Sequence, residues 1–170
     1  QEMKWWNSVD RGVMPGSSSN HHLHTLPGML IAIREMAEYG RQYATQTVAN
    51  AKALGQALAD EGVNVEAEEF GFTESHQLAL NVTNFGVAKV IARSLAEKNN
   101  IITNYNLLPR DEDTNNPSGL RIGVQEMTRY GMKEGDMQEL AALMKAGLEG
   151  KVVKNDVVQL RSRFTEVHYA

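Results

Sequence analysis

One arginine stands between two glycines in a segment whose residues alternate like those of a strand. The segment covers residues 118–123 and reads Ser-Gly-Leu-Arg-Ile-Gly. In it the apolar Leu120 and Ile122 flank Arg121, and such alternation sends successive side chains to opposite faces of a sheet. Glycine neighbours let a ligand or another backbone come close. Arg121 is therefore a candidate carboxylate receptor, whose planar guanidinium offers two parallel hydrogen bonds.

A structural role for this arginine is the alternative. Surface arginines on strands often pair with a nearby Asp or Glu, and residues 118–123 alone leave both roles open. The preceding stretch, residues 104–109, reads Asn-Tyr-Asn-Leu-Leu-Pro and follows a short predicted strand at 101–103. A polar, acidic loop at 110–117 connects it to the arginine strand.

A second polar segment lies near the start of the chain. Residues 16–20 read Gly-Ser-Ser-Ser-Asn and precede a predicted helix. Backbone N–H groups and hydroxyls placed before a helix can cradle an anion, because the helix N-terminus has free donors. Histidines follow at positions 21, 22 and 24. We do not predict a metal site there, since no carboxylate or thiolate adjoins them and their spacing is not that of a helical pair.

Composition excludes several classes of protein. The 170-residue chain has a net charge of −4 and no clustered basic residues, so the electrostatic basis for nucleic-acid binding is missing. It has no cysteine, which excludes disulfides, thiolate metal sites and a cysteine nucleophile. No apolar run approaches the roughly 20 residues of a membrane span. No signal-peptide pattern is visible, so we expect a cytoplasmic protein. The chain starts at Gln1 without an initiator methionine, which is expected of an excised piece, of ordinary trimming or of a tag scar.

The periodicities predict an α+β fold with a mostly antiparallel sheet and helices on one face. Residues 1–25 read as loop and short turn and belong to another body, with Trp5 and Trp6 as core or interface residues. A long helix at 26–60 connects this remnant to a C-terminal domain at 61–170. Within that domain, strands are expected at 63–68, 77–82, 101–103 and 118–123, and helices at 87–98, 133–148 and from 152 to about 167.

Six short motifs, in this order, resemble those of the serine hydroxymethyltransferase family, pyridoxal-phosphate enzymes of fold type I. The resemblance covers nearly the whole chain and corresponds to the C-terminal portion of the family. The segments that carry it are 14–20, the long helix at 26–60, Thr-Glu-Ser-His at 73–76, Asn-Tyr-Asn-Leu-Leu-Pro at 104–109, Ser-Gly-Leu-Arg-Ile-Gly at 118–123 and Thr-Arg-Tyr-Gly at 128–131.

The resemblance implies roles for particular residues. Arg121 would bind the α-carboxylate of the amino-acid substrate, and Asn106 would lie near the pterin. Ser19 and Asn20 stand where the family has two glycines that bind the cofactor phosphate of the neighbouring subunit. That change, together with Val-Gln-Glu at 124–126 in place of Thr-Pro-Ala, suggests a divergent subgroup whose one-carbon carrier is an unusual pterin or is absent.

The resemblance also implies an activity: reversible transfer of a hydroxymethyl group between serine and glycine, with pyridoxal 5'-phosphate and a tetrahydropterin, in a homodimer or larger homo-oligomer. No lysine here has the context of the family's Schiff-base lysine, so the fragment alone is expected to be inactive and not to hold the cofactor. Two alternatives stay open. One is a carrier-independent aldolase or transaldolase on β-hydroxy amino acids, and the other is a non-catalytic binding or oligomerisation module.

Overall fold

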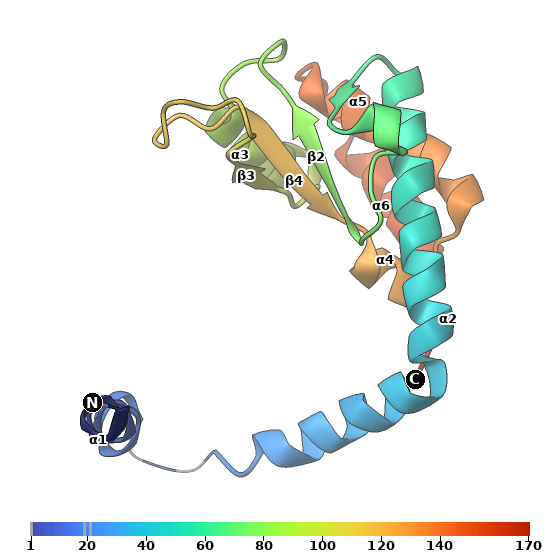
Figure 1. Cartoon of the computed structure of the whole chain (residues 1–170). Coiled ribbons are helices and arrows are strands. Elements are labelled where there is room, and N and C mark those ends of the chain that lie inside the picture. The colour runs from blue at the N-terminus through green and yellow to red at the C-terminus, as the bar shows by residue number, and fades with distance from the viewer. Residues whose placement is uncertain (1, 19, 21) are drawn as a thin grey trace. The chain divides into compact units, whose positions relative to one another are not determined.

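The computed structural model describes residues 2–18, 20 and 22–170, and Figure 1 shows the whole chain. The contacts divide the chain into two compact units, Gln1–Glu38 and Tyr39–Ala170. The elements that begin in the first unit are α1 (Glu2–Gly12), a π-helical turn η1 (Val13–Ser17) and the 36-residue helix α2 (Thr25–Asp60), which ends in the second unit.

The second unit holds a four-stranded sheet in which every pair of neighbours is antiparallel. The order is β1-β2-β4-β3, so β4 is an inner strand bonded on both sides. Leu78 lies opposite Ile122, and Leu80 lies opposite Leu120. The predicted α+β class with a mostly antiparallel sheet is therefore confirmed. The strands are β1 (Asn64–Val65), β2 (Gln77–Asn81), β3 (Asn104–Asn106) and β4 (Gly119–Gly123).

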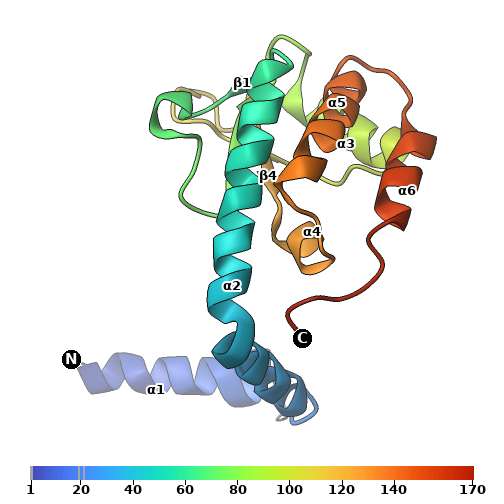
Figure 2. The ribbon, with the colours of Figure 1, turned by 90° about the vertical axis from the view of Figure 1, so that its right-hand side faces the viewer.

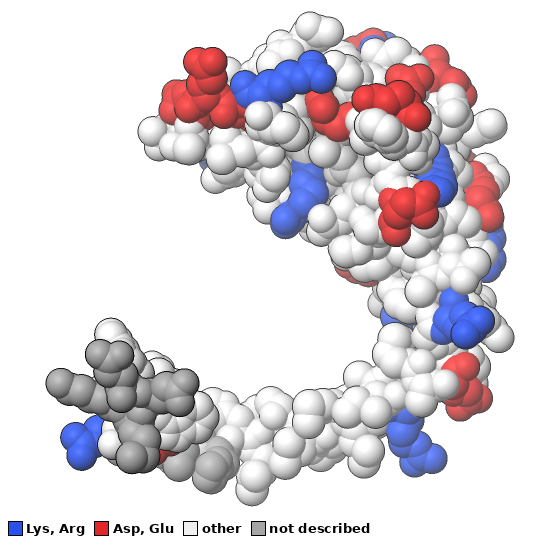
Figure 3. All heavy atoms as spheres, viewed as in Figure 1, with Lys and Arg blue, Asp and Glu red and all other residues white. Residues whose placement is uncertain are grey.

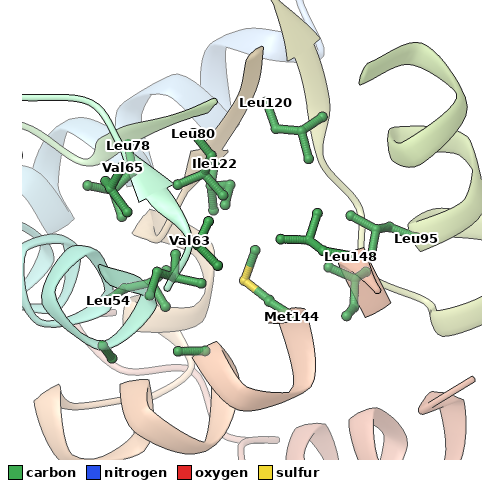
Figure 4. Close-up of a cluster of buried hydrophobic side chains, with 14 of the residues drawn as sticks. Leu54, Val63, Val65, Leu78, Leu80, Leu95, Leu120, Ile122, Met144 and Leu148 are labelled. Atoms are coloured by element: carbon green, nitrogen blue, oxygen red, sulfur yellow. The ribbon is translucent and has the colours of Figure 1, made fainter. Parts of the chain in front are cut away.

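Helices cover one face of this sheet. Apolar residues of β2 and β4 pack with those of the C-terminal half of α2, of α3 and of α5 in one buried cluster (Figure 4). Figure 2 shows α2 and α5 on the same side of the strands. The remaining helical elements are η2 (Glu68–Phe70), α3 (Ala88–Asn99), α4 (Gln125–Arg129), η3 (Glu134–Asp136), α5 (Met137–Leu148) and α6 (Lys154–Ser162).

The buried positions of α2 recur at helical spacing within the second unit. Ala51, Leu54 and Leu58 have no exposed surface and form one stripe against the sheet. A Cβ on Gly55 would lie 2.7 Å from Cγ of Phe72, so the helix approaches this ring closely only because residue 55 is glycine. The helix ends before Gly62, which has a φ of 75° and reverses the chain into β1.

Several predicted boundaries were wrong. Residues 2–12 form helix α1 and not a loop, because no proline interrupts them and their apolar residues recur at three- and four-residue steps. Trp5 and Trp6 are 76% and 72% exposed, so they are not core residues of this chain, and their interface role stays a prediction. The first strand covers only Asn64–Val65, since Ala67 turns the chain with a φ of 61°.

Two further segments differ from their predictions. The strand expected at 101–103 lies three residues later, at β3, because Asn100 ends α3 in the left-handed region and Ile101 then packs into the core. The last helix ends at Ser162 rather than near residue 167. The tail beyond it folds back instead, and the His168 N–H donates to the Arg129 carbonyl at 2.7 Å.

Candidate functional site

Arg121 is the middle residue of the inner strand β4 and points away from the helices. Its neighbours Leu120 and Ile122 are 0% and 8% exposed and face the core, whereas Arg121 is exposed. The guanidinium makes no hydrogen bond or ion pair with any other residue that the structure describes. Figure 3 shows basic atoms over β4 within a mostly uncharged stretch of surface. The backbone is held on both sides while the guanidinium stays open to a ligand.

Two asparagines of β3 share this open face. Asn104 lies directly opposite Arg121, and Asn106 lies opposite Gly119, two pairs along the ladder. Both are exposed. Directly opposed residues of an antiparallel pair have Cβ atoms about 4.5–5.5 Å apart, so one small ligand can reach both side chains. The sequence analysis singled out Asn106 and missed Asn104, although the two-residue spacing of the amides already places them on one face.

Gly119 sets how closely the β3–β4 connection approaches the arginine strand. A Cβ at this position would lie 2.6 Å from Cδ2 of Leu108 and 2.8 Å from the carbonyl oxygen of Asn106. The space beside this glycine is therefore filled by the chain itself and not by a ligand. Leu108 is 7% exposed and packs against β4 at Gly119.

Asp111 closes the β3–β4 connection. Its carboxylate accepts hydrogen bonds from the backbone N–H groups of Leu108 at 2.8 Å and Ser118 at 2.9 Å, and from the Ser118 hydroxyl at 2.5 Å. These bonds, led by the Ser118 hydroxyl, lower the pKa of Asp111 below its ordinary value. The polar loop at 110–117 is mostly exposed, and one of its acidic residues ties both of its ends together.

Asp111→Asn is expected to destabilise the 170-residue chain at neutral pH, with a penalty that disappears in acid. Because the folded pKa of Asp111 is lowered, the unfolded state binds more protons and the stabilisation is complete above the ordinary pKa of about 3.9. It is lost as the pH falls through the folded pKa, where the protonated carboxyl resembles the amide. Thermal melting of both proteins from pH 7 downwards measures this gap in stability.

Glu112→Gln is the matched control for that experiment. Glu112 is the exposed neighbour of Asp111 and makes no hydrogen bond to another described residue. Its substitution should leave the melting temperature nearly unchanged at every pH. A gap for Asp111→Asn that is constant down to the acid limit would contradict the role given to this carboxylate.

A buried polar network anchors the end of β4 to α2. The Asn50 amide nitrogen donates to the Thr128 hydroxyl at 2.9 Å and to the Met132 carbonyl at 2.8 Å, and the Thr128 hydroxyl donates to the Val124 carbonyl at 2.8 Å. Nearby, the Tyr43 hydroxyl donates to the Gln125 carbonyl at 2.7 Å. Burial raises the pKa of Tyr43. Sequence reasoning identified Thr128 as part of a motif but missed Asn50, which lies on a stripe of apolar residues.

The candidate phosphate segment belongs to the first unit. Ser19 lies outside the described residues. Asn20 is exposed, and its carbonyl accepts the Ser18 hydroxyl at 3.1 Å, while its side-chain amide makes no hydrogen bond to another described residue. Helix α2 begins five residues later, where the Thr25 hydroxyl donates to the His22 carbonyl at 2.7 Å. This segment thus offers a free amide shortly before a long helix.

Comparisons with known proteins agree with the motifs. A family model described as serine hydroxymethyltransferase matches residues 2–144. The chain belongs to the serine hydroxymethyltransferase family. Serine hydroxymethyltransferases of Methanobrevibacter smithii and Metallosphaera sedula are 50% and 49% identical to it, over 95% and 99% of this chain. The match covers 39% and 40% of those proteins, so the chain spans about two fifths of the length of these family members.

A solved structure of an enzyme with a different name has the same fold. The crystal structure of an L-threonine transaldolase from Pseudomonas fluorescens matches with a TM-score of 0.76 and 30% sequence identity. The match covers 92% of this chain and 36% of that one. The chain therefore has the fold found in part of a fold type I enzyme. In the residues that the structure describes, the present chain has no helix that is both long and apolar enough to cross a membrane.

Proposed function

We propose that this chain is the C-terminal part of a longer enzyme that interconverts serine and glycine with pyridoxal phosphate and a tetrahydropterin. The observation that carries the proposal is the open guanidinium of Arg121, held on an inner strand with no partner among the described residues. Membership of the serine hydroxymethyltransferase family supports the reaction.

Arg121 binds and orients the substrate. Its fork accepts the α-carboxylate of serine or glycine through two parallel hydrogen bonds, which fixes the direction of the bonds at Cα. The backbone of β4 is hydrogen-bonded to β2 and β3 on its two sides, which holds Arg121 in a fixed position. Asn104 and Asn106 add amide donors and acceptors on the same face, and Asn106 contacts the pterin.

The residues near α2 fit a phosphate group by their donor chemistry. Asn20 has a free side-chain amide, and together with Ser19 it precedes the positive end of a 36-residue helix. We assign Ser19 and Asn20 to the phosphate of pyridoxal phosphate bound in a neighbouring subunit, which makes the enzyme a homodimer or a larger homo-oligomer. When bound, the cofactor supplies the electron sink for chemistry at Cα. The lysine that links to it lies elsewhere in the longer protein.

These roles assign each part of the chain to a domain of the longer enzyme. Residues 1–25 belong to the large cofactor-binding domain, residues 26–60 connect the two domains, and residues 61–170 carry the substrate arginine. The enzyme acts in the cytoplasm, in one-carbon metabolism. The departures at positions 19, 20 and 124–126 assign it to a subgroup with its own pterin carrier.

The expected result for the longer enzyme is that tetrahydropterin accelerates serine cleavage. An acceptor held beside the reacting carbon should raise the rate by about tenfold or more, because capture of the one-carbon unit becomes intramolecular. Initial rates of glycine formation, with and without carrier, measure this. The similarity to a threonine transaldolase makes the second candidate concrete: a rate indifferent to every pterin tried would favour carrier-independent cleavage.

A further inference from the structure

A pocket that the proposed reaction does not use lies within the second unit. It has a volume of about 320 Å³ and opens between α4, α5, α6 and residues 100–103. This volume is at the lower end of the range for small-molecule sites. Most of its lining is apolar and comes from Ile101, Ile122, Met127, Met132, Met144 and Leu160. Arg121 faces the opposite side of β4, since Ile122 is turned toward the core.

Three methionines make this lining adaptable. Met132 and Met144 are each 2% exposed, and Met127 is partly buried against the same cluster. Unbranched thioether side chains fit ligands of irregular shape and favour apolar groups. The pocket is therefore suited to an aliphatic or thioether chain of about four or five heavy atoms.

Polar groups are present at defined points of the same lining. The Thr103 hydroxyl oxygen is buried and has no hydrogen-bond partner among the described residues. An unsatisfied buried hydroxyl calls for a partner, which is either a water molecule or a ligand. Because the oxygen itself has almost no accessible surface, it does not reach the open volume of the pocket, and the charged groups of the lining are the ones available to a ligand.

Arg161 is the cation of the pocket, and it is held in place. Its guanidinium carbon lies 4.4 Å from the centre of the Tyr130 ring, and Nη1 donates to the Phe164 carbonyl. Its other N–H groups have no hydrogen-bond acceptor among the described residues. A guanidinium that is stacked on an aromatic ring and has unused N–H donors is preorganised to bind a carboxylate.

Glu126 supplies the opposite charge. It lines the same pocket, is exposed, and forms no ion pair with Arg161, because no described carboxylate lies within 4.0 Å of that guanidinium. A simple acid would place its charge near a second carboxylate, and a simple amine would place its charge near Arg161. A ligand with both charges matches both residues.

We propose that this pocket binds an apolar α-amino acid of the size of leucine or methionine. The carboxylate lies on Arg161, the ammonium group faces Glu126, and the side chain enters the methionine-rich interior. This binding is independent of the proposed reaction, so it is tested without cofactor or turnover.

The test is titration of the 170-residue chain with L-leucine and L-methionine, followed by NMR shifts of the methionine methyl groups. Saturable shifts of Met127, Met132 and Met144 are expected. Glycine, 4-methylpentanoate and 3-methylbutylamine, which lack the side chain, the ammonium and the carboxylate respectively, should each bind about tenfold more weakly or worse, since each loses one of the three contacts. Equal binding of 4-methylpentanoate and leucine would overturn the zwitterion assignment.

Variants separate this site from adventitious binding. Arg161→Gln should weaken leucine binding about tenfold, and Glu126→Gln, at an exposed position that should not affect folding, should weaken it severalfold. Arg163→Gln is the control, because Arg163 lies two residues on and pairs with Glu139 at 2.6 Å instead. The absence of any methyl shift at about 10 mM leucine would mean a dissociation constant too high for a specific site, and it overturns the proposal. Unchanged binding by Glu126→Gln overturns the role of the carboxylate.

Discussion

In the longer enzyme that we propose, replacing Arg121 by lysine is expected to lower kcat/KM for serine by about 100-fold or more. The guanidinium offers two parallel donors to a carboxylate, and an ammonium group at the same place offers a point charge without the fork. Loss of one charge-assisted hydrogen bond is worth about 1.5–3 kcal/mol, which corresponds to roughly 10- to 150-fold, and misplacement of Cα adds to it. Steady-state kinetics and glycine binding by the same variant measure the effect.

The matched control is Arg93→Lys on α3. Arg93 is exposed and pairs with Glu97 one helical turn away, with a distance of 2.8 Å between Nε and the carboxylate. Such a surface pair is worth little, so kcat/KM should stay within about twofold of the parent value. If Arg121→Lys and Arg93→Lys behave alike, with glycine binding retained in both, then Arg121 is not the carboxylate receptor.

Asn50→Ala is expected to lower the free energy of unfolding of the 170-residue chain by about 2–3 kcal/mol. Asn50 has no exposed surface, and its amide group donates to Thr128 and Met132 and accepts from the Gln46 amide at 2.9 Å. Its removal leaves the Met132 carbonyl without this donor in a buried setting, and each buried group left unpaired costs about 1–3 kcal/mol. Urea denaturation followed by far-UV circular dichroism gives the difference.

Gln56→Ala on the same helix serves as the reference. Gln56 is exposed and hydrogen-bonds to Asp60 at 2.9 Å, so its loss should change stability by less than about 0.5 kcal/mol. The double variant with Thr128→Val should destabilise less than the sum of the two single changes, because both act on one hydrogen bond. A cost for Asn50→Ala as small as that of Gln56→Ala would show that the network contributes nothing to stability.

The sequence predicts the fold well where a segment shows a single clear hydrophobic periodicity, either that of a strand or that of a helix. Alternation around Arg121 gave its face correctly, because Leu120 and Ile122 had to be buried together. The three- and four-residue spacing of α2 gave its extent to within a residue at each end. Both signals are local, and tertiary packing reinforces them.

The site's supporting residues could not be predicted because their roles depend on distant partners. Asp111 looks like any acidic loop residue until Leu108 and Ser118 are seen to converge on it. Asn50 hydrogen-bonds to Thr128 and Met132, which lie 78 and 82 positions further along the chain. Asn104 was predictable, since Asn106 two residues later must share its face of the sheet. The contact of Leu108 with Gly119 could not be predicted either, because it depends on how the β3–β4 connection folds back.

The most direct test of the central claim is a crystal structure of the longer enzyme with pyridoxal phosphate and glycine. The account predicts both carboxylate oxygens of glycine at about 2.7–2.9 Å from two guanidinium nitrogens of Arg121, the bidentate geometry of such pairs. A glycine carboxylate held by another residue, with Arg121 paired to an internal Asp or Glu, would contradict it.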